Sequence, residues 1–300
     1  MRKVVKGLVI ALAAIIGLLI VAFVLLFFTG RSRFNKTYEV AVSPITLPSD
    51  EAALARGEHL VSAVAHCAYC HGEGLAGDIV EEGAPQGLIV APNLTGGAGG
   101  IGAEYAAEDW VRTLRHGVLP QGRSTFVMPS TSFSQMSEDD LLAMTAYLQT
   151  IPALDNELPQ TSPGPLFYLL LGAGPMTEAQ AATRIDHEAP FSPAPQEGET
   201  AEYGEYLVTI AQCAGCHGPE LAGGRACGNC PPGPNLTPGG ELQGWTQDDF
   251  VTALRTGTTP TGRQLSEFMP WRYFRNMTGA ELAAIWAYLQ AQPARETARP

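Results

Sequence analysis

The sequence predicts a mainly α-helical protein in which one N-terminal transmembrane helix precedes two tandem domains of the same type. Three observations lead to this fold class. Residues 7–28 form an uninterrupted apolar run. The rest of the chain matches itself at an offset of about 140 to 147 residues, which is the size of a domain and not of a solenoid repeat. Within each copy, apolar residues recur at helical spacing and no convincing alternating strand appears.

The apolar run at the N-terminus is long enough to cross the roughly 30 Å hydrocarbon layer of a membrane as a helix. It exceeds a signal-peptide core of roughly 7 to 15 residues, and no A-x-A-like cleavage site follows it. We therefore expect residues 1–36 to be a retained, single-pass membrane anchor. Its flanking charges balance and do not set its orientation: they are Arg2, Lys3 and Lys6 on one side and Arg31, Arg33 and Lys36 on the other.

The internal repeat assigns one domain to residues 50–152 and the other to residues 200–293, with a linker over 153–199 between them. The matches run through both copies in the same order. The matched segments are Gly57–Val61 with Gly204–Val208, Pro92–Thr95 with Pro234–Thr237, Glu108–Gly117 with Asp248–Gly257, Pro120–Arg123 with Pro260–Arg263, Met128–Pro129 with Met269–Pro270, and Ala146–Gln149 with Ala287–Gln290.

Three pairs of helices are expected in the two copies. Thr246 followed by Asp249 forms a capping box, and a glycine ends the same helix. The last pair has capping residues of the same kind, with Asp140 and Glu281 three positions after the N-cap. The expected helices are Ala55–Ala65 with Ala201–Ala211, a middle pair ending at Gly117 and Gly257, and a final pair starting at Ser137 and Thr278 and stopping before Pro152 and Pro293.

Each copy contains a C-x-x-C-H motif, CAYCH at Cys67–His71 and CAGCH at Cys213–His217. This motif is the signature of covalent c-type haem attachment, in which two thiols bind the porphyrin and the histidine binds the iron. A zinc site or a disulfide would tolerate one chance histidine after a cysteine pair, but not two. We predict two covalently bound haems on Cys67, Cys70, Cys213 and Cys216, with His71 and His217 as iron ligands.

The attachment motif, the later Pro-Asn-Leu, the Met-Pro and a final helix with Ala-Tyr-Leu resemble the class I cytochrome c family. The resemblance covers about 50–150 and 200–292. It implies that Met128 and Met269 supply the sixth iron ligands. It also implies that the carbonyls of Pro92 and Pro234 accept the proton of the proximal histidines. A thioether ligand favours Fe(II) and raises the reduction potential, and the carbonyl orients the imidazole.

Other residues compete for these roles. Met136 and Met277 also recur, but they directly precede the helix caps and are read as core methionines. Four histidines do not recur at equivalent positions and are read as surface or packing residues: His59, His66, His116 and His187.

Haem propionates need cationic or hydrogen-bonding donors. Arg123 and Arg263 are the preferred candidates because both follow matched glycines. Arg112, Arg115 and Arg255 are further candidates, for which a solvated helix face is the competing explanation. Trp110, Trp245 and Trp271 could line the haem edges, but ordinary core packing explains them equally well.

Two features stand outside the repeat. Cys227 and Cys230 form C-G-N-C without a following histidine, so we expect a local disulfide in an oxidising compartment, with a redox-active dithiol or a metal site as alternatives. The linker contains an apolar segment, Pro165–Gly172, that is too short to cross a bilayer. It either docks on the membrane or a partner subunit, or joins the two haem domains.

Residues 37–300 carry 30 acidic residues against 12 arginines, a formal charge of −18. This excess argues against nucleic acid or anionic lipid as a ligand and favours partners with basic patches. Simple solubility of an acidic protein would give the same composition.

These observations predict a dihaem cytochrome c of the inner membrane, with a cytoplasmic N-terminus and periplasmic haem domains. It would relay single electrons from a dehydrogenase or quinol-side donor to a downstream cytochrome or oxidase. Similar tandem domains serve as subunits of periplasmic dehydrogenases. No catalytic residue is predicted, because six-coordinate iron leaves no open position. A haem-bearing subunit of a terminal oxidase, a dihaem peroxidase and a thiol-switch protein are the alternatives.

Overall fold

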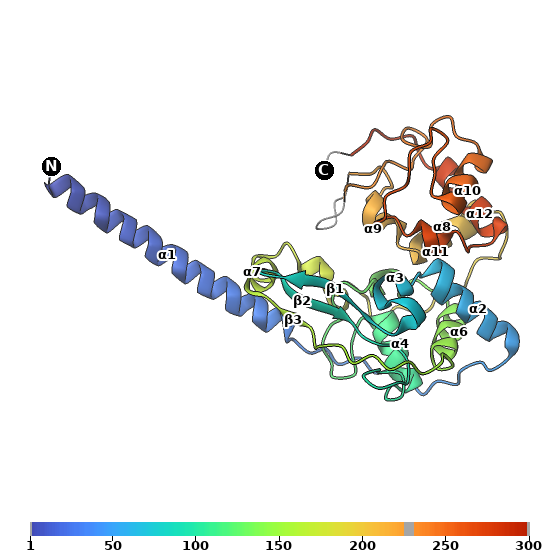
Figure 1. The fold of residues 1–300 in the computed structure, drawn as a ribbon, viewed down its shortest axis with the longest axis horizontal. Coiled ribbons are helices and arrows are strands. Elements are labelled where there is room, and N and C mark those ends of the chain that lie inside the picture. Colours follow the sequence, from blue (N-terminus) through green and yellow to red (C-terminus); the bar gives the residue numbers. More distant parts are fainter. Residues whose placement is uncertain (1, 225–230, 299–300) are drawn as a thin grey trace.

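The computed structural model describes residues 2–224 and 231–298. A long N-terminal helix, α1 (Arg2–Phe34), projects from a body made of two helical domains (Figure 1). Within the described residues, α1 is the one helix that is long and apolar enough to cross a membrane, and its apolar stretch is not buried inside the protein. Cys227 and Cys230 lie outside the described residues, so their pairing stays a prediction.

The two domains share one succession of helices. The capping box of Thr246 and Asp249 and the left-handed glycines that end both middle helices, Gly117 and Gly257, match the sequence prediction. The first domain contains α2 (Glu51–His59), a π-helical turn (Leu60–Val64), α3 (Ala68–His71), α4 (Ala107–His116), α5 (Ser130–Phe133) and α6 (Glu138–Leu148). The second contains α8 (Ala201–Ile210), α9 (Cys213–His217), α10 (Gln247–Thr256), α11 (Trp271–Phe274) and α12 (Gly279–Ala291).

A small sheet in the first domain was not predicted. Strands β1 (Asp78–Gly83) and β2 (Gly87–Ala91) form an antiparallel hairpin, and β3 (Ser162–Pro163) of the linker pairs with β2. Most of β1 is exposed and the hairpin register shifts between Ile79 and Glu81, so the strands bury no alternating apolar face. A strand without that alternation leaves little signal in a single sequence.

In each domain the first and last helices cross at a glycine. A Cβ placed on Gly57 would lie 2.0 Å from the Ala143 carbonyl oxygen, and one on Gly204 would lie 2.0 Å from that of Ala284. These crossings join α2 to α6 and α8 to α12. The glycines that recur in the sequence are therefore packing residues that bring two backbones together.

We expect Gly204→Ala to lower the free energy of unfolding by about 1–3 kcal/mol, because the added methyl group overlaps the α12 backbone. Gly279→Ala is the matched control, since a Cβ at Gly279 meets no atom within 4 Å. Urea unfolding of the haem-loaded protein measures both. Equal effects of the two substitutions would contradict the close crossing.

The linker forms α7 (Pro165–Ala173), which packs against the end of α1 (Figure 1). Among the described elements its main contact is with the N-terminal helix, so it does not join the two haem domains to each other as one expectation had it. Docking on the membrane or a partner subunit stays a prediction.

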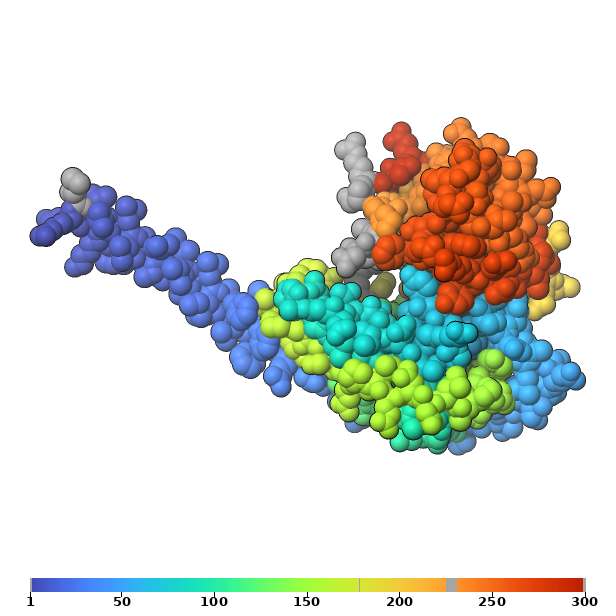
Figure 2. Space-filling model, in the orientation of Figure 1, coloured from blue at the N-terminus to red at the C-terminus, as the bar shows by residue number. Residues whose placement is uncertain are grey.

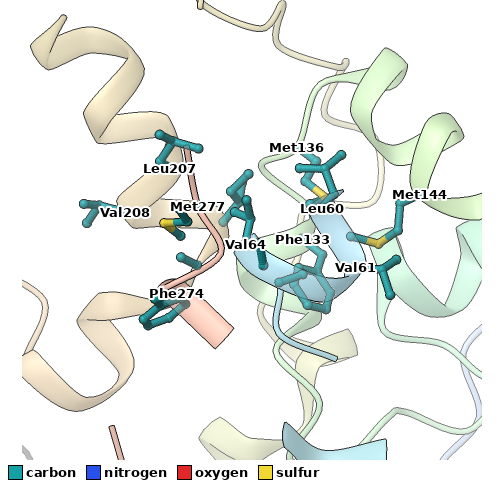
Figure 3. Packing of buried hydrophobic residues seen from close by; sticks show 14 of the residues in the cluster. Leu60, Val61, Val64, Phe133, Met136, Met144, Leu207, Val208, Phe274 and Met277 are labelled. Carbon is teal, nitrogen blue, oxygen red and sulfur yellow. The ribbon is translucent and has the colours of Figure 1, made fainter. Parts of the chain in front are cut away.

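One hydrophobic core runs through both domains (Figure 3). Leu60 and Val64 of the π-helical turn lie between the two sets of side chains, beside Leu207, Phe274 and Met277 of the second domain. The turn also contacts α11, and α5 contacts α8. A shared core of this kind holds the two domains in one arrangement.

A polar network borders this core and follows the symmetry of the repeat. From the first domain, His59 Nε2 lies 2.8 Å from a Glu281 carboxylate oxygen at the start of α12. From the second, the equivalent Tyr206 donates its hydroxyl to Asp140 at the start of α6, over 2.7 Å. Asp140 also accepts two hydrogen bonds from Arg56, at 2.8 and 2.9 Å. Each domain thus contacts the first turn of the other domain's last helix.

The caps of α6 and α12 differ for this reason. Thr278 and Glu281 form the predicted capping box. In α6, Ser137 caps the Asp140 amide as expected, but the Asp140 carboxylate does not return to the Ser137 amide. The Ser137 amide donates instead to the Tyr206 hydroxyl, over 3.2 Å. A residue of the second domain thus completes the cap of a helix in the first.

Candidate haem-binding sites

The two C-x-x-C-H motifs lie in short helices, α3 and α9, that follow the first helix of each domain. The residue before each motif is in the left-handed region, with φ of 41° at His66 and 60° at Gln212. The glycine after each motif also has positive φ, 69° at Gly72 and 80° at Gly218. Each motif is therefore a single turn held between two sharp changes of direction.

Each motif histidine contacts the proline carbonyl named by the resemblance. His71 Nδ1 lies 2.9 Å from the Pro92 oxygen, and His217 Nδ1 lies 2.8 Å from the Pro234 oxygen. Burial lowers the pKa of both histidines and outweighs the opposing effect of these hydrogen bonds. A neutral imidazole that donates from Nδ1 carries its lone pair on Nε2, which is the form that binds a metal ion.

An asparagine and a threonine form a buried turn directly after each of these prolines, and the sequence had given them no role of their own. The Asn93 side chain accepts from the Thr95 amide over 2.9 Å, and the Asn235 side chain accepts from the Thr237 amide over 2.8 Å. All four residues are at most 2% exposed. The signal was present, because Pro-Asn-Leu-Thr recurs as a whole tetrapeptide.

Cys67, Cys70 and Cys213 form no disulfide among the described residues. Burial is the main cause that raises the pKa of Cys67 and of Cys213 to about 12. Across residues 2–224 and 231–298, no group of three or more His, Cys, Asp or Glu side chains is arranged to hold a metal ion. The described part of the chain thus lacks the ligand cluster that a structural zinc site needs.

The four repeated methionines fall into two environments. Met136 and Met277 are at most 2% exposed and are packed in the shared core (Figure 3). Met128 and Met269 are partly buried in the loops before α5 and α11, at the edge of that core. The packing agrees with the reading of Met136 and Met277 as core residues, while iron ligation by Met128 and Met269 stays a prediction.

The arginines predicted to bind propionates have other partners in the structure. The Arg123 guanidinium lies over the Phe34 ring, 5.6 Å from its centroid, and Arg263 pairs with Glu241. Their role toward haem stays a prediction. Three other buried donors find no acceptor among the described residues: Trp110 Nε1, Trp271 Nε1 and Arg115 Nη1.

These orphaned donors test whether the residues fit a haem. A buried donor without an acceptor is costly, and a haem propionate is an anionic acceptor. Trp110 and Trp271 come from the middle helix of the first domain and from α11 of the second, so each domain supplies one. Together with the histidine and proline pairs, the donor set fits the prosthetic group.

The remaining histidines are engaged elsewhere. His59 contacts Glu281, and His116 Nδ1 lies 3.2 Å from His187 Nδ1. The His66 ring packs edge-on against Phe274, with centroids 5.0 Å apart. These contacts match the interpretation of the four as packing residues.

Comparison with known proteins agrees with this geometry. A family model described as cytochrome c oxidase, cbb3-type, subunit III matches residues 52–148 and again residues 199–289. The chain belongs to this family. Two matches in one chain cover both haem motifs and confirm two cytochrome c-type domains. As a c-type cytochrome the protein binds haem and transfers electrons.

Several named relatives are subunits of dehydrogenases. The chain is 26% identical over 274 residues to the fructose dehydrogenase cytochrome subunit of Gluconobacter japonicus, covering 84% of this chain and 55% of that protein. It is 31% identical over 237 residues to the alcohol dehydrogenase (quinone) cytochrome c subunit of Gluconobacter oxydans, covering 70% and 48%. The chain thus spans about half the length of these curated relatives.

A diheme cytochrome c-type protein of Cereibacter sphaeroides is 29% identical over 231 residues, with 70% of this chain and 73% of that protein covered. Its length is closer to that of the present chain. The name of that relative specifies two haems.

Proposed function

We propose that this protein is a membrane-anchored relay with two haems, attached at Cys67 and Cys70 and at Cys213 and Cys216. When bound, each haem iron alternates between Fe(II) and Fe(III) and carries one electron. His71 and His217 bind the two irons from one side, and Met128 and Met269 bind them from the other.

The observation that supports this proposal best is the pairing of each motif histidine with a proline carbonyl at nearly the same distance, 2.9 and 2.8 Å. The proximal sides of both sites are built alike, which favours the same electron-carrying role for both haems over a peroxidase with two unlike haems. The shared core and polar network hold both sites in one body, which suits electron transfer between them.

The location and partners follow from the N-terminal helix and from the relatives. Helix α1 would cross the inner membrane with its N-terminus in the cytoplasm, because covalent haem attachment takes place outside the cytoplasm. The acidic body would then meet basic surfaces of redox partners in the periplasm. The names of the relatives favour a dehydrogenase as the electron donor. The acceptor would be a downstream cytochrome or oxidase.

The direct test follows haem reduction in native membranes. A dehydrogenase substrate such as an alcohol or a sugar should reduce both haems, and oxygen should reoxidise them. Deleting this chain should abolish substrate-dependent oxygen uptake. Uptake at the wild-type rate without the chain, together with haems that no substrate reduces, would contradict the proposed relay.

The family model favours a second candidate, a haem-bearing subunit of a terminal oxidase. In that case the chain would purify in a fixed ratio with an oxidase core and its absence would remove the oxidase activity itself, measured with an artificial electron donor. The relay between separate partners predicts that this oxidase activity persists.

A further inference from the structure

The loop that carries Met128 is attached to the end of α1. The Tyr38 amide, just beyond α1, donates to the Gly122 carbonyl over 2.8 Å. Thr37 forms an isolated antiparallel bridge with Arg123, whose guanidinium lies over the Phe34 ring. The backbone before Met128 is therefore bound to the end of the N-terminal helix.

The same loop also packs on α7 and on the segment that follows it. The Phe126 ring lies 4.5 Å from the Phe167 ring of α7, centroid to centroid, and 6.4 Å from the Phe34 ring of α1. The Val127 amide donates to the Ala179 carbonyl over 3.3 Å. Gln180 pairs with Phe126 and donates its side-chain amide to the Arg33 carbonyl over 2.9 Å. The two residues that precede Met128, Phe126 and Val127, thus both contact the linker.

Helices α1 and α7 in turn form one rigid unit, which we call the brace (residues 26–34 of α1 with α7 and Gln180). Their backbones nearly touch, since a Cβ on Gly30 would lie 1.8 Å from the Tyr168 oxygen and one on Gly172 would lie 2.0 Å from the Leu26 oxygen. Arg33 Nη1 donates to the Leu171 and Gly172 carbonyls over 2.7 and 3.0 Å, which caps the C-terminal end of α7. Figure 2 shows the linker packed around the end of the N-terminal helix.

The backbone next to Met128 needs such support. Val127 has φ of 70°, a left-handed conformation that is unfavourable for a β-branched residue. Strain of this kind persists only where neighbouring structure imposes it. Here Phe34 and Phe167 of the brace supply the aromatic surface that contacts the loop, and Ala179, next to Gln180 of the brace, supplies the carbonyl that Val127 binds.

The equivalent loop of the second domain has no such support among the described residues. Its backbone makes the same internal contact, with Leu265 bonded to Gly257 as Thr125 is to Gly117, both over 2.7 Å. Its other hydrogen bonds stay within the second domain. Ser266 stands three residues after Arg263, where the first domain has Phe126 after Arg123, and Phe268 beside Met269 is 47% exposed.

We propose that the brace is a positioning element of the first haem site, so that methionine ligation in the first domain depends on the α1–α7 contact and ligation in the second does not. The inference rests on the proposed function in taking Met128 and Met269 as iron ligands. Gly30, Gly172 and Arg33 are positioning residues, because they act on Met128 only through the loop.

The test compares two glycine-to-leucine substitutions in the full-length, haem-loaded protein. Gly172→Leu forces α7 away from α1, whereas Gly17→Leu places the same side chain on a face of α1 where a Cβ meets no atom within 4 Å. The first readout is the far-red charge-transfer band of methionine-ligated Fe(III) haem. Gly172→Leu should remove about half of the band, and Gly17→Leu should leave it intact. In a Met269→Leu background, Gly172→Leu should remove all that remains.

The second readout does not depend on haem. Trypsin cleavage after Arg123 reports opening of the first loop, and cleavage after the equivalent Arg263 is an internal control. Gly172→Leu should raise the rate at Arg123 at least about tenfold, which corresponds to about 1.4 kcal/mol of lost loop stability. The rate at Arg263 should not change.

The outcomes separate failure of the brace from failure of the ligand assignment. If Met128→Leu removes half of the band but Gly172→Leu changes neither the band nor cleavage at Arg123, the proposed positioning role of the brace is wrong. If Met128→Leu leaves the band intact, the ligand assignment is wrong. The cleavage rate at Arg123 alone then decides whether the brace supports the first loop. Should Gly172→Leu fail to accumulate, Arg33→Gln removes the cap of α7 and is expected to change both readouts in the same direction.

Discussion

Replacing Met128 or Met269 with leucine is expected to lower the reduction potential of that haem on the order of 100 mV, within the range of about 0.8 V that axial ligands control. Leucine keeps the size of the side chain but has no sulfur to bind and stabilise Fe(II). The altered haem should lose its far-red band and bind carbon monoxide in the reduced state. Potentiometric titration of the purified protein measures the shift for each haem.

The core methionines provide matched controls for this prediction. Met136→Leu and Met277→Leu remove the same sulfur from positions that are at most 2% exposed. Such volume-conserving changes cost less than about 1.5 kcal/mol in the free energy of unfolding. Both potentials should stay at their wild-type values. Shifted potentials in these two variants, with unchanged potentials in Met128→Leu and Met269→Leu, would reverse the assignment.

Replacing Asp140 with asparagine is expected to lower the free energy of unfolding by about 3 kcal/mol, because it removes an ion pair within the first domain and the hydrogen bond from Tyr206 of the second domain. The carboxylate binds Arg56 and accepts from Tyr206, and its removal leaves the Arg56 charge without its main partner. Loss of one member of a buried ion pair costs about 3–5 kcal/mol, and the lower value applies because the Arg56 side chain remains 21% exposed.

Asp139→Asn is the control for this substitution, because Asp139 is the exposed neighbour on the same helical turn. Urea unfolding of the haem-loaded protein should show a lower midpoint for Asp140→Asn alone. Similar midpoints for both variants would mean that the network does not stabilise the domain contact.

The same contact should weaken in acid. Burial alone would raise the pKa of Glu281, but hydrogen bonds from His59 and the Thr278 amide, with the charges of His59 and Arg56, hold it below its ordinary value of 4.5. A depressed pKa in the folded state stabilises the protein above that ordinary value, and the stabilisation is lost as the pH falls through the folded-state pKa. Glu281→Gln should flatten this part of the stability curve, measured by urea unfolding at a series of pH values.

The haem motifs, the helix caps and the repeat could be predicted because each is a local pattern whose chemistry fixes its geometry. The contacts between domains could not. Tyr206 stands at the position equivalent to His59, where the alignment showed only that the histidine does not recur. In the structure it completes the cap of α6 across the interface. A single sequence does not show which surfaces of two similar domains meet.

The linker and the two predicted arginines show the same limit. The apolar segment Pro165–Gly172 was recognised, but its partner α1 lies more than a hundred residues away in the sequence. Arg123 was matched with Arg263 by position, yet the structure places it over Phe34 because only the first domain adjoins the N-terminal helix. Likewise, β1 and β2 are surface strands without an alternating apolar face, so their pairing had no signal in the residue pattern.

The most direct test of the two-haem relay is a redox titration of the intact protein, with haem content and the far-red charge-transfer band measured on the same sample. We predict two haems per chain, two one-electron transitions, and a methionine–Fe(III) band from both haems. One haem per chain, or a high-spin haem without this band in the wild-type protein, would contradict the account.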